Sequence, residues 1–171
     1  MPAVRNFRRS VSLTGLLFCA CFAQSAFAQN VTMFGGNSLA TQCYDLSQNA
    51  AITNTASTTD LEVCNNAIFH GELNQKDLVA TYVNRGIIHM ALADYKSAGR
   101  DYNRALRMAD DVGEAYVNRG NLWFVANRFT AAIADYDKSL EYGIEKPYVA
   151  LLKKVCLRGY LLIKPLLSNL H

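Results

Sequence analysis

One stretch of the sequence, residues 82–140, carries the same pattern twice. Tyr82-Val83-Asn84-Arg85-Gly86 returns 34 residues later as Tyr116-Val117-Asn118-Arg119-Gly120. The register continues downstream, where the pairs are Tyr95 and Phe129, Ala98 and Ala132, Asp101 and Asp135, Tyr102 and Tyr136, and Leu106 and Leu140. A fixed period of this length predicts stacked supersecondary units, none of which can bury its apolar face alone.

Each copy contains two stripes of residues with helical spacing. In the first copy these are Tyr82, Gly86 and His89, then Tyr95, Ala98, Tyr102 and Ala105. Two antiparallel helices would place Gly86 opposite Ala98, so that small residues meet where the backbones approach closely. The spacing therefore predicts a helix hairpin in each copy.

The pattern resembles the tetratricopeptide repeat (TPR), a helix–turn–helix unit of this length, in a first copy (79–112) and a second copy (113–146). The resemblance implies an all-α fold, namely a right-handed solenoid of antiparallel helix hairpins. Residues 39–71 fit a degenerate first hairpin, since Cys64 and Ala67 align with Tyr102 and Ala105. The second helix of this hairpin is expected to start at Thr59 or Asp60 as its N-cap.

The first 28 residues have the order of a secretory signal peptide. Arg5, Arg8 and Arg9 precede an apolar run at 11–22, and Ala26-Phe27-Ala28 stands before Gln29. This pattern predicts cleavage after Ala28 and export to the periplasm or beyond. The run is too short to favour a membrane span, although a retained anchor is the alternative. Residues 29–38 are predicted to be a flexible leader.

The charge balance argues against nucleic-acid binding. The chain has 17 Lys and Arg against 14 Asp and Glu, and loss of three arginines with residues 1–28 leaves 14 of each. Five of the remaining basic residues lie in 146–171, so 29–145 holds nine basic side chains against 14 acidic ones. This composition does not build the basic face that phosphate binding requires.

Cys43 and Cys64 are the cysteines of the degenerate hairpin, one in each predicted helix. In the oxidising compartment that export implies, we expect them to form a structural disulfide. A redox-active pair is disfavoured because the Cys-x-x-Cys spacing is absent.

Candidate catalytic residues are sparse. His70, His89 and His171 lack metal-ligand spacing with other donors, and the sequence contains no nucleophile elbow, phosphate loop or dinucleotide fingerprint. His89 stands where the second copy has Trp123, which favours packing. We therefore expect no enzymatic activity, no cofactor and no metal.

Two arginines accompany two aspartates at the same offset, Arg85 with Asp101 and Arg119 with Asp135. We expect ion pairs inside each copy that support the hairpins. The alternative is contact of Arg with a carboxylate or phosphate of a ligand.

In TPR proteins the first helix of each unit lines a concave groove that holds a peptide or helix of another protein. Carried over, the groove positions are Val83, Ile87, Met90, Val117, Asn121 and Phe124. Because these are mostly apolar, and only Asn121 matches the set that clamps a terminal carboxylate, the resemblance implies an apolar helix or peptide as partner. The other possibility is that they bury against the next helix or the tail.

Residues 147–171 depart from the repeat, with Ala150-Leu151-Leu152-Lys153-Lys154 where the Tyr-x-Asn-Arg-Gly signature is due. One interpretation is a helix docked on the second copy through Leu151, Leu152 and Val155. Another is a membrane-surface helix with a basic face of Lys153, Lys154, Arg158 and Lys164. A third is an altered chain end.

The sequence as a whole predicts a non-catalytic scaffold that binds another protein. The alternative is a membrane-surface accessory protein that acts through its tail. The oligomeric state does not follow from the sequence.

Overall fold

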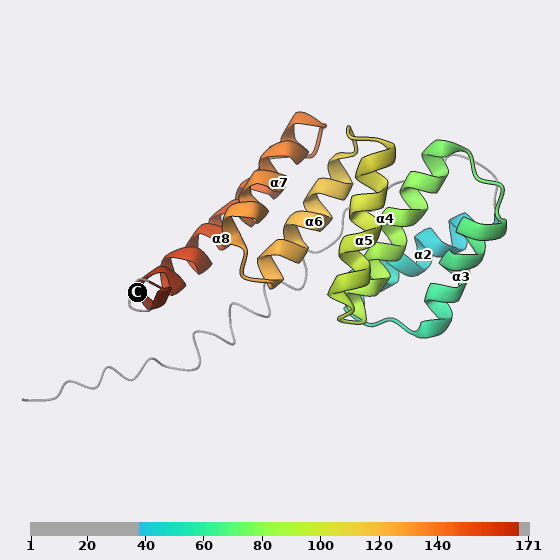
Figure 1. The fold of residues 1–171 in the computed structure, drawn as a ribbon, viewed down its shortest axis with the longest axis horizontal. Coiled ribbons are helices and arrows are strands. Elements are labelled where there is room, and N and C mark those ends of the chain that lie inside the picture. Colours follow the sequence, from blue (N-terminus) through green and yellow to red (C-terminus); the bar gives the residue numbers. More distant parts are fainter. Residues whose placement is uncertain (1–37, 168–171) are drawn as a thin grey trace, which may run out of the picture.

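The computed structural model describes residues 38–167, which form seven helices and no strand (Figure 1). The helices are α2 (Ser38–Thr53), α3 (Thr58–His70), α4 (Gln75–Ala91), α5 (Tyr95–Met108), α6 (Gly113–Val125), α7 (Phe129–Glu141) and α8 (Lys146–Leu167). The predicted all-α fold is confirmed for this range. The predicted signal peptide (1–28) and most of the leader (29–38) lie outside the described residues; Ser38 begins α2.

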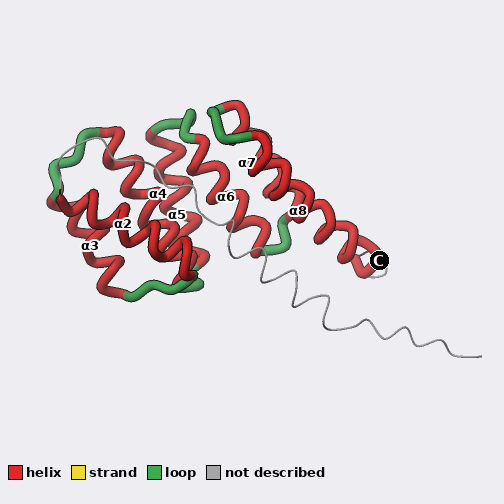
Figure 2. The backbone as a smooth tube through the Cα atoms, turned by 180° about the vertical axis from the view of Figure 1, so that it is seen from behind, coloured by secondary structure: helices red, strands yellow, loops and turns green. Residues whose placement is uncertain are grey.

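Each helix packs against the next one along the chain, and α2 and α6 also pack against α4. Both views show the helices in a row, from α2 and α3 at one end to α8 at the other (Figures 1 and 2). The loops between them contain only three or four residues. Connections this short are typical of neighbouring helices that pack together.

Polar side chains set where several helices begin. The Ser57 hydroxyl accepts a hydrogen bond from the Asp60 backbone N–H at 3.3 Å, and the Ser57 N–H donates to the Asp60 carboxylate at 2.8 Å. This reciprocal cap satisfies two backbone donors at the start of α3. The expected N-cap at Thr59 or Asp60 is therefore wrong, because Asp60 completes the cap from inside the helix. Asn74 and Asp94 cap α4 and α5.

A tyrosine ring lies against a glycine between the two helices of each copy. A Cβ atom added at Gly120 would come within 2.5 Å of the Tyr136 ring, and Gly86 has the same relation to Tyr102. Both rings are buried. This contact explains glycines that cost about 1 kcal/mol in a helix relative to alanine. At the second glycine the Ala132 carbonyl oxygen also lies 3.3 Å from the added Cβ, so the expected small residue stands close by and the tyrosine ring packs beside it.

Buried side chains form three clusters along the row. One joins α4, α5 and α6 around Val83 and Tyr102, a second joins α7 and α8 around Tyr136 and Cys156, and a third joins α2, α3 and α4. Because every cluster draws on more than one helix pair, no pair completes its core alone.

Cys43 of α2 and Cys64 of α3 form a disulfide, with their Cα atoms 4.9 Å apart. Both residues are fully buried in the third cluster, beside Ile88 of α4. The predicted bond is confirmed. It links the two helices of the N-terminal hairpin. The buried apolar side chains that this hairpin itself contributes are small, since they are alanines and cysteines.

The helix α8 docks on α7 through residues spaced to share one helix face. Val149 and Cys156 are fully buried in the second cluster, and Leu152 packs against it. Burial raises the pKa of the Cys156 thiol to about 11. The helix is docked, as one interpretation of the tail expected, and Leu152 makes one of the three expected contacts, whereas Leu151 is exposed on the other side.

Candidate functional site

The structure buries four of the six predicted groove residues, namely Val83, Ile87, Val117 and Asn121. None of the four is more than 4% exposed. The expectation that they form an open apolar surface is therefore wrong. Their burial follows from the stacking of helices, because α4 contacts α2, α3, α5 and α6, while α6 contacts α4, α5 and α7.

The other two groove residues, Met90 and Phe124, are half-buried. Met90 packs on the cluster of α4, α5 and α6. The Phe124 ring lies edge-on to Phe129, with centroids 5.7 Å apart, close to Gly159 of α8. Burial against neighbouring helices and the tail, the alternative kept open above, thus describes the whole set.

The structure brings both expected ion pairs together. Arg85 donates from Nε and Nη2 to the two carboxylate oxygens of Asp101, at 2.8 and 2.7 Å. Arg119 makes the same two bonds to Asp135, both at 2.7 Å. The hydrogen bond to Asp135 raises the pKa of Arg119 against the effect of burial. Two parallel bonds fix direction as well as charge, so each pair sets the angle between its two helices.

Each arginine also reaches a third helix, a contact that sequence analysis missed. Arg85 Nη1 donates to the Asn65 side chain of α3 at 2.7 Å, and Arg119 Nη1 donates to Asn103 of α5 at 2.8 Å. The guanidinium groups additionally lie over the rings of Tyr82 and Tyr116. Three of the five N–H donors of each guanidinium are thus directed to protein acceptors, so both arginines support the fold.

The 34-residue spacing also relates α8 to α6, but with different residues at the equivalent positions. At the 34-residue spacing, Lys153 corresponds to Arg119, and Asp137 of α7 corresponds to Asn103 of α5. Lys153 Nζ donates to Asp137 Oδ1 at 2.5 Å. The bond between Lys153 and Asp137 is therefore the counterpart of the Arg119–Asn103 contact, and it joins the first half of α8 to α7.

His89 lies in a charged, partly buried environment between α4 and α5. Its ring nitrogens are 3.5 Å from an Asp94 oxygen and 3.8 Å from an Asp101 oxygen. Burial lowers the pKa of His89, while Asp101 and Asp94 oppose that shift and Arg85 and Arg100 reinforce it. Asp101 is also held by Arg85, so His89 packs beside an ion pair that is already formed.

The outward side of α8 exposes several leucines on one helix face. Leu151, Leu157 and Leu161 are 55%, 49% and 57% exposed, and Lys154 and Arg158 lie exposed among them. We call these five residues the open α8 face. Their spacing places them on the side of α8 opposite Val149 and Cys156.

The open α8 face corresponds to a covered face elsewhere in the chain. At the 34-residue spacing, Lys154 and Leu157 take the places of Gly120 and Trp123 on α6. Gly120 lies beneath Tyr136 of α7. The helix α7 thus covers on α6 the side that remains open on α8.

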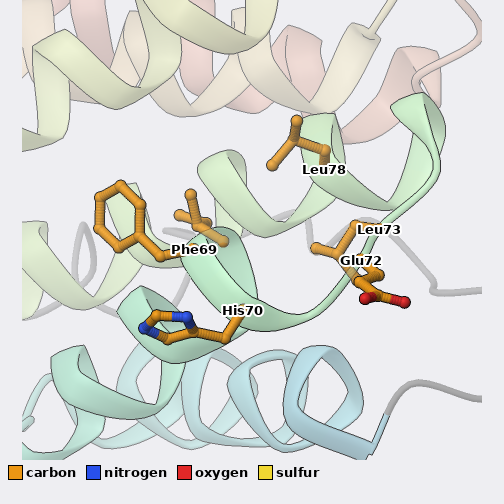
Figure 3. Close-up of a pocket in the computed structure, with 6 residues that line it drawn as sticks. Phe69, His70, Glu72, Leu73 and Leu78 are labelled. Carbon is orange, nitrogen blue, oxygen red and sulfur yellow. The ribbon is translucent and has the colours of Figure 1, made fainter.

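A shallow cleft of about 460 Å³ lies where α3 ends and α4 begins (Figure 3). It is lined by Ile68, Phe69, His70, Glu72, Leu73 and Leu78. In the close-up, His70 and Glu72 stand at opposite sides of the cleft. The lining therefore combines apolar side chains with His70 and Glu72, and more of its exposed surface is polar than apolar.

Within residues 38–167, no three histidine, cysteine or acidic side chains gather closely enough to hold a metal ion. None of the helices in that range has the length and apolar character needed to cross a membrane. Comparisons of the chain with protein-family models, curated proteins and solved structures find no match.

Proposed function

We propose that this chain is an exported, non-catalytic scaffold that binds another protein, and that the open α8 face is its contact surface. The observation that carries the proposal is the exposure of three leucines on α8. The equivalent sides of α4 and α6 are instead covered by α5 and α7. An uncovered apolar side of a helix gains free energy when another helix buries it.

A TPR-like right-handed solenoid is the arrangement we propose for the helices. Two observations support it. The contacts of Arg85 recur at Arg119 with the same atoms and nearly the same distances. In addition, α4 packs on both α2 and α6, as first helices of successive units do in such stacks.

Export is supported by the N-terminal pattern and by the Cys43–Cys64 bond, because disulfides persist in oxidising compartments. The exported chain should begin at Gln29. Intact-mass measurement of the protein recovered from outside the cytoplasm tests this start, and a mass that includes residues 1–28 would make that segment an anchor.

A membrane-surface role is the second candidate, and the same helix supports it. Three leucines interspersed with Lys154 and Arg158 fit a helix that lies in the plane of an acidic bilayer. Protein binding ranks first because the equivalent sides of α4 and α6 are covered by protein helices.

Site-specific photocrosslinking in the native cells tests the proposal. A photoreactive residue at Leu157 should yield a discrete adduct with another protein. A matched probe at Ile52, which is 78% exposed at the far end of the row, should not. Lipid adducts at Leu157 without a protein adduct would move the membrane role to first place, and equal protein adducts at both positions would contradict a specific surface.

A further inference from the structure

We infer that the open α8 face receives an acidic amphipathic helix of a partner protein, placed on α8 as α5 is on α4 and α7 is on α6. This inference rests on the proposed function and specifies the chemistry of the partner. It is carried by a contact that recurs along the chain and is incomplete at α8.

The complete contact joins three helices. Arg119 on α6 bonds Asn103 on the preceding helix α5 and the carboxylate of Asp135 on the covering helix α7. Arg85 on α4 makes the equivalent bonds to Asn65 on α3 and Asp101 on α5. In both cases the covering helix supplies the acid.

Lys153 on α8 makes one part of this contact, namely the bond to the preceding helix. It bonds Asp137 on the preceding helix α7 at 2.5 Å. No covering helix follows within the described residues, so the acid that Asp101 and Asp135 supply has no counterpart there. Lys154 and Arg158 add exposed positive charge on the same side. A covering helix that carries carboxylates opposite these residues would complete the contact.

The segments on either side of the acidic part of the sequence, 1–37 and 146–171, are poorly suited to supply that helix. Residues 1–37 and 146–171 contain no Asp or Glu. Two copies that met through their open α8 faces would place Lys154 and Arg158 of one near those of the other, and like charges oppose such contact. The complementary charge therefore points to a different protein.

One substitution limits the shape of the partner. Lys154 stands where Gly86 and Gly120 accept a tyrosine ring. A tyrosine at the matching place of the partner helix would meet the Lys154 side chain, so we expect a small residue there and a carboxylate within reach of the ammonium group.

The experiment measures binding of a labelled peptide to the exported chain by fluorescence anisotropy. The probe has the sequence of residues 129–142, whose acids are Asp135, Asp137 and Glu141, with Tyr136→Ala to clear Lys154. A hydrocarbon staple keeps this short helix folded. A control peptide replaces the three acids by the corresponding amides.

Two chain variants give the matched comparison. Lys154→Glu with Arg158→Glu reverses charge on the open α8 face, while Lys96→Glu with Arg104→Glu makes the same charge change at exposed sites on α5. We expect the acidic peptide to bind, and the amide peptide and the α8 variant each to weaken binding by about tenfold or more. The α5 variant should bind as the unaltered chain does.

Equal binding of both peptides, or equal loss in both variants, overturns the inference. So does binding to phosphatidylglycerol vesicles that the α8 variant abolishes while neither peptide binds. The inference is likewise overturned, in favour of a second copy of the chain, if the chain associates with itself and the acidic peptide does not displace the second copy. If crosslinking at Leu157 yields a protein but the peptides bind equally, the proposed function stands and only the acidic partner is wrong. If crosslinking yields none, both fall.

Discussion

Tyr136 donates its hydroxyl hydrogen to Oδ1 of Asn121 at 2.9 Å, whereas Tyr102, at the same place in the first copy, has no acceptor for its hydroxyl group among residues 38–167. The reason lies in the facing residue, because Ile87 occupies the place of Asn121. Both tyrosines are buried. The chain thus contains the same aromatic contact with and without its hydrogen bond.

Removal of the two hydroxyl groups should have different effects on the free energy of unfolding. Tyr136→Phe removes a buried hydrogen bond to Asn121 Oδ1 and should destabilise the fold by about 1–2 kcal/mol. Tyr102→Phe removes a hydroxyl that is buried without a partner, so stability should stay the same or rise. Urea unfolding of both variants measures the difference, and equal losses would show that Tyr102 has an acceptor.

The Arg85–Asp101 pair should be strongly coupled. The two side chains are 14% and 6% exposed, so Arg85→Ala leaves a nearly buried carboxylate and should cost about 3 kcal/mol or more. The double variant with Asp101→Ala should recover part of that loss. A double-mutant cycle measures the coupling, and strict additivity of the two single losses would contradict a pair that acts as a unit.

Reduction of the Cys43–Cys64 bond should lower the free energy of unfolding by about 3 kcal/mol, as expected for a bridge across a separation of 21 residues. Cys43→Ser with Cys64→Ser should match the reduced protein. Alkylation of a chain that begins at Gln29, unfolded without reductant, should modify Cys156 alone. Three modified cysteines in that sample would show that the bond is absent.

Gly120→Ala should destabilise the fold, because the added methyl group would meet the Tyr136 ring and overpacking of this kind costs about 1–3 kcal/mol. Gly99→Ala in α5 is the control, since its added Cβ would meet only the end of the Leu122 side chain, at 3.1 Å. That side chain can move, and alanine favours the helix. Thermal unfolding should therefore separate the two variants, with the lower midpoint for Gly120→Ala.

Acid should weaken the fold through His89. Burial lowers the pKa of His89 in the folded chain from its usual 6.5, so the unfolded chain binds the proton first as pH falls. Stability is then complete above about pH 6.5 and declines below it. The unfolding free energy of His89→Gln, measured from pH 7.5 to 5, should decline less steeply. An identical decline in both proteins would show that Asp94 and Asp101 balance the effect of burial on the His89 pKa, and a steeper decline in His89→Gln would show that they outweigh it.

The repeated register let the sequence predict contacts inside a copy. Arg85 and Asp101 recur together as Arg119 and Asp135, and a pair that recurs at one offset indicates one contact made twice. Cys43 and Cys64 were predictable because the predicted hairpin and the predicted export limit the choice of partner. Both inferences needed only residues that lie within one helix hairpin.

Contacts between copies were harder to predict. The bonds from Arg119 to Asn103 and from Arg85 to Asn65 cross from one helix pair to the next. Whether Val83 and Val117 are buried or exposed likewise depends on how helix pairs stack. Periodicity identifies the residues that share one helix face, but it does not say which element covers that face. The open α8 face escaped prediction for the same reason, because its covered counterpart on α6 is evident only from the packed helices.

The bond between Lys153 and Asp137 also shows how a chain of this kind could grow. Asp137 already stands where Asn103 receives Arg119, so a duplicated block of residues 113–146 would bring its own arginine to that carboxylate. The duplicate would then offer a second Asp137 to Lys153. Lengthening by whole blocks would therefore leave each junction chemically satisfied, whereas an insertion of any other length would break the register.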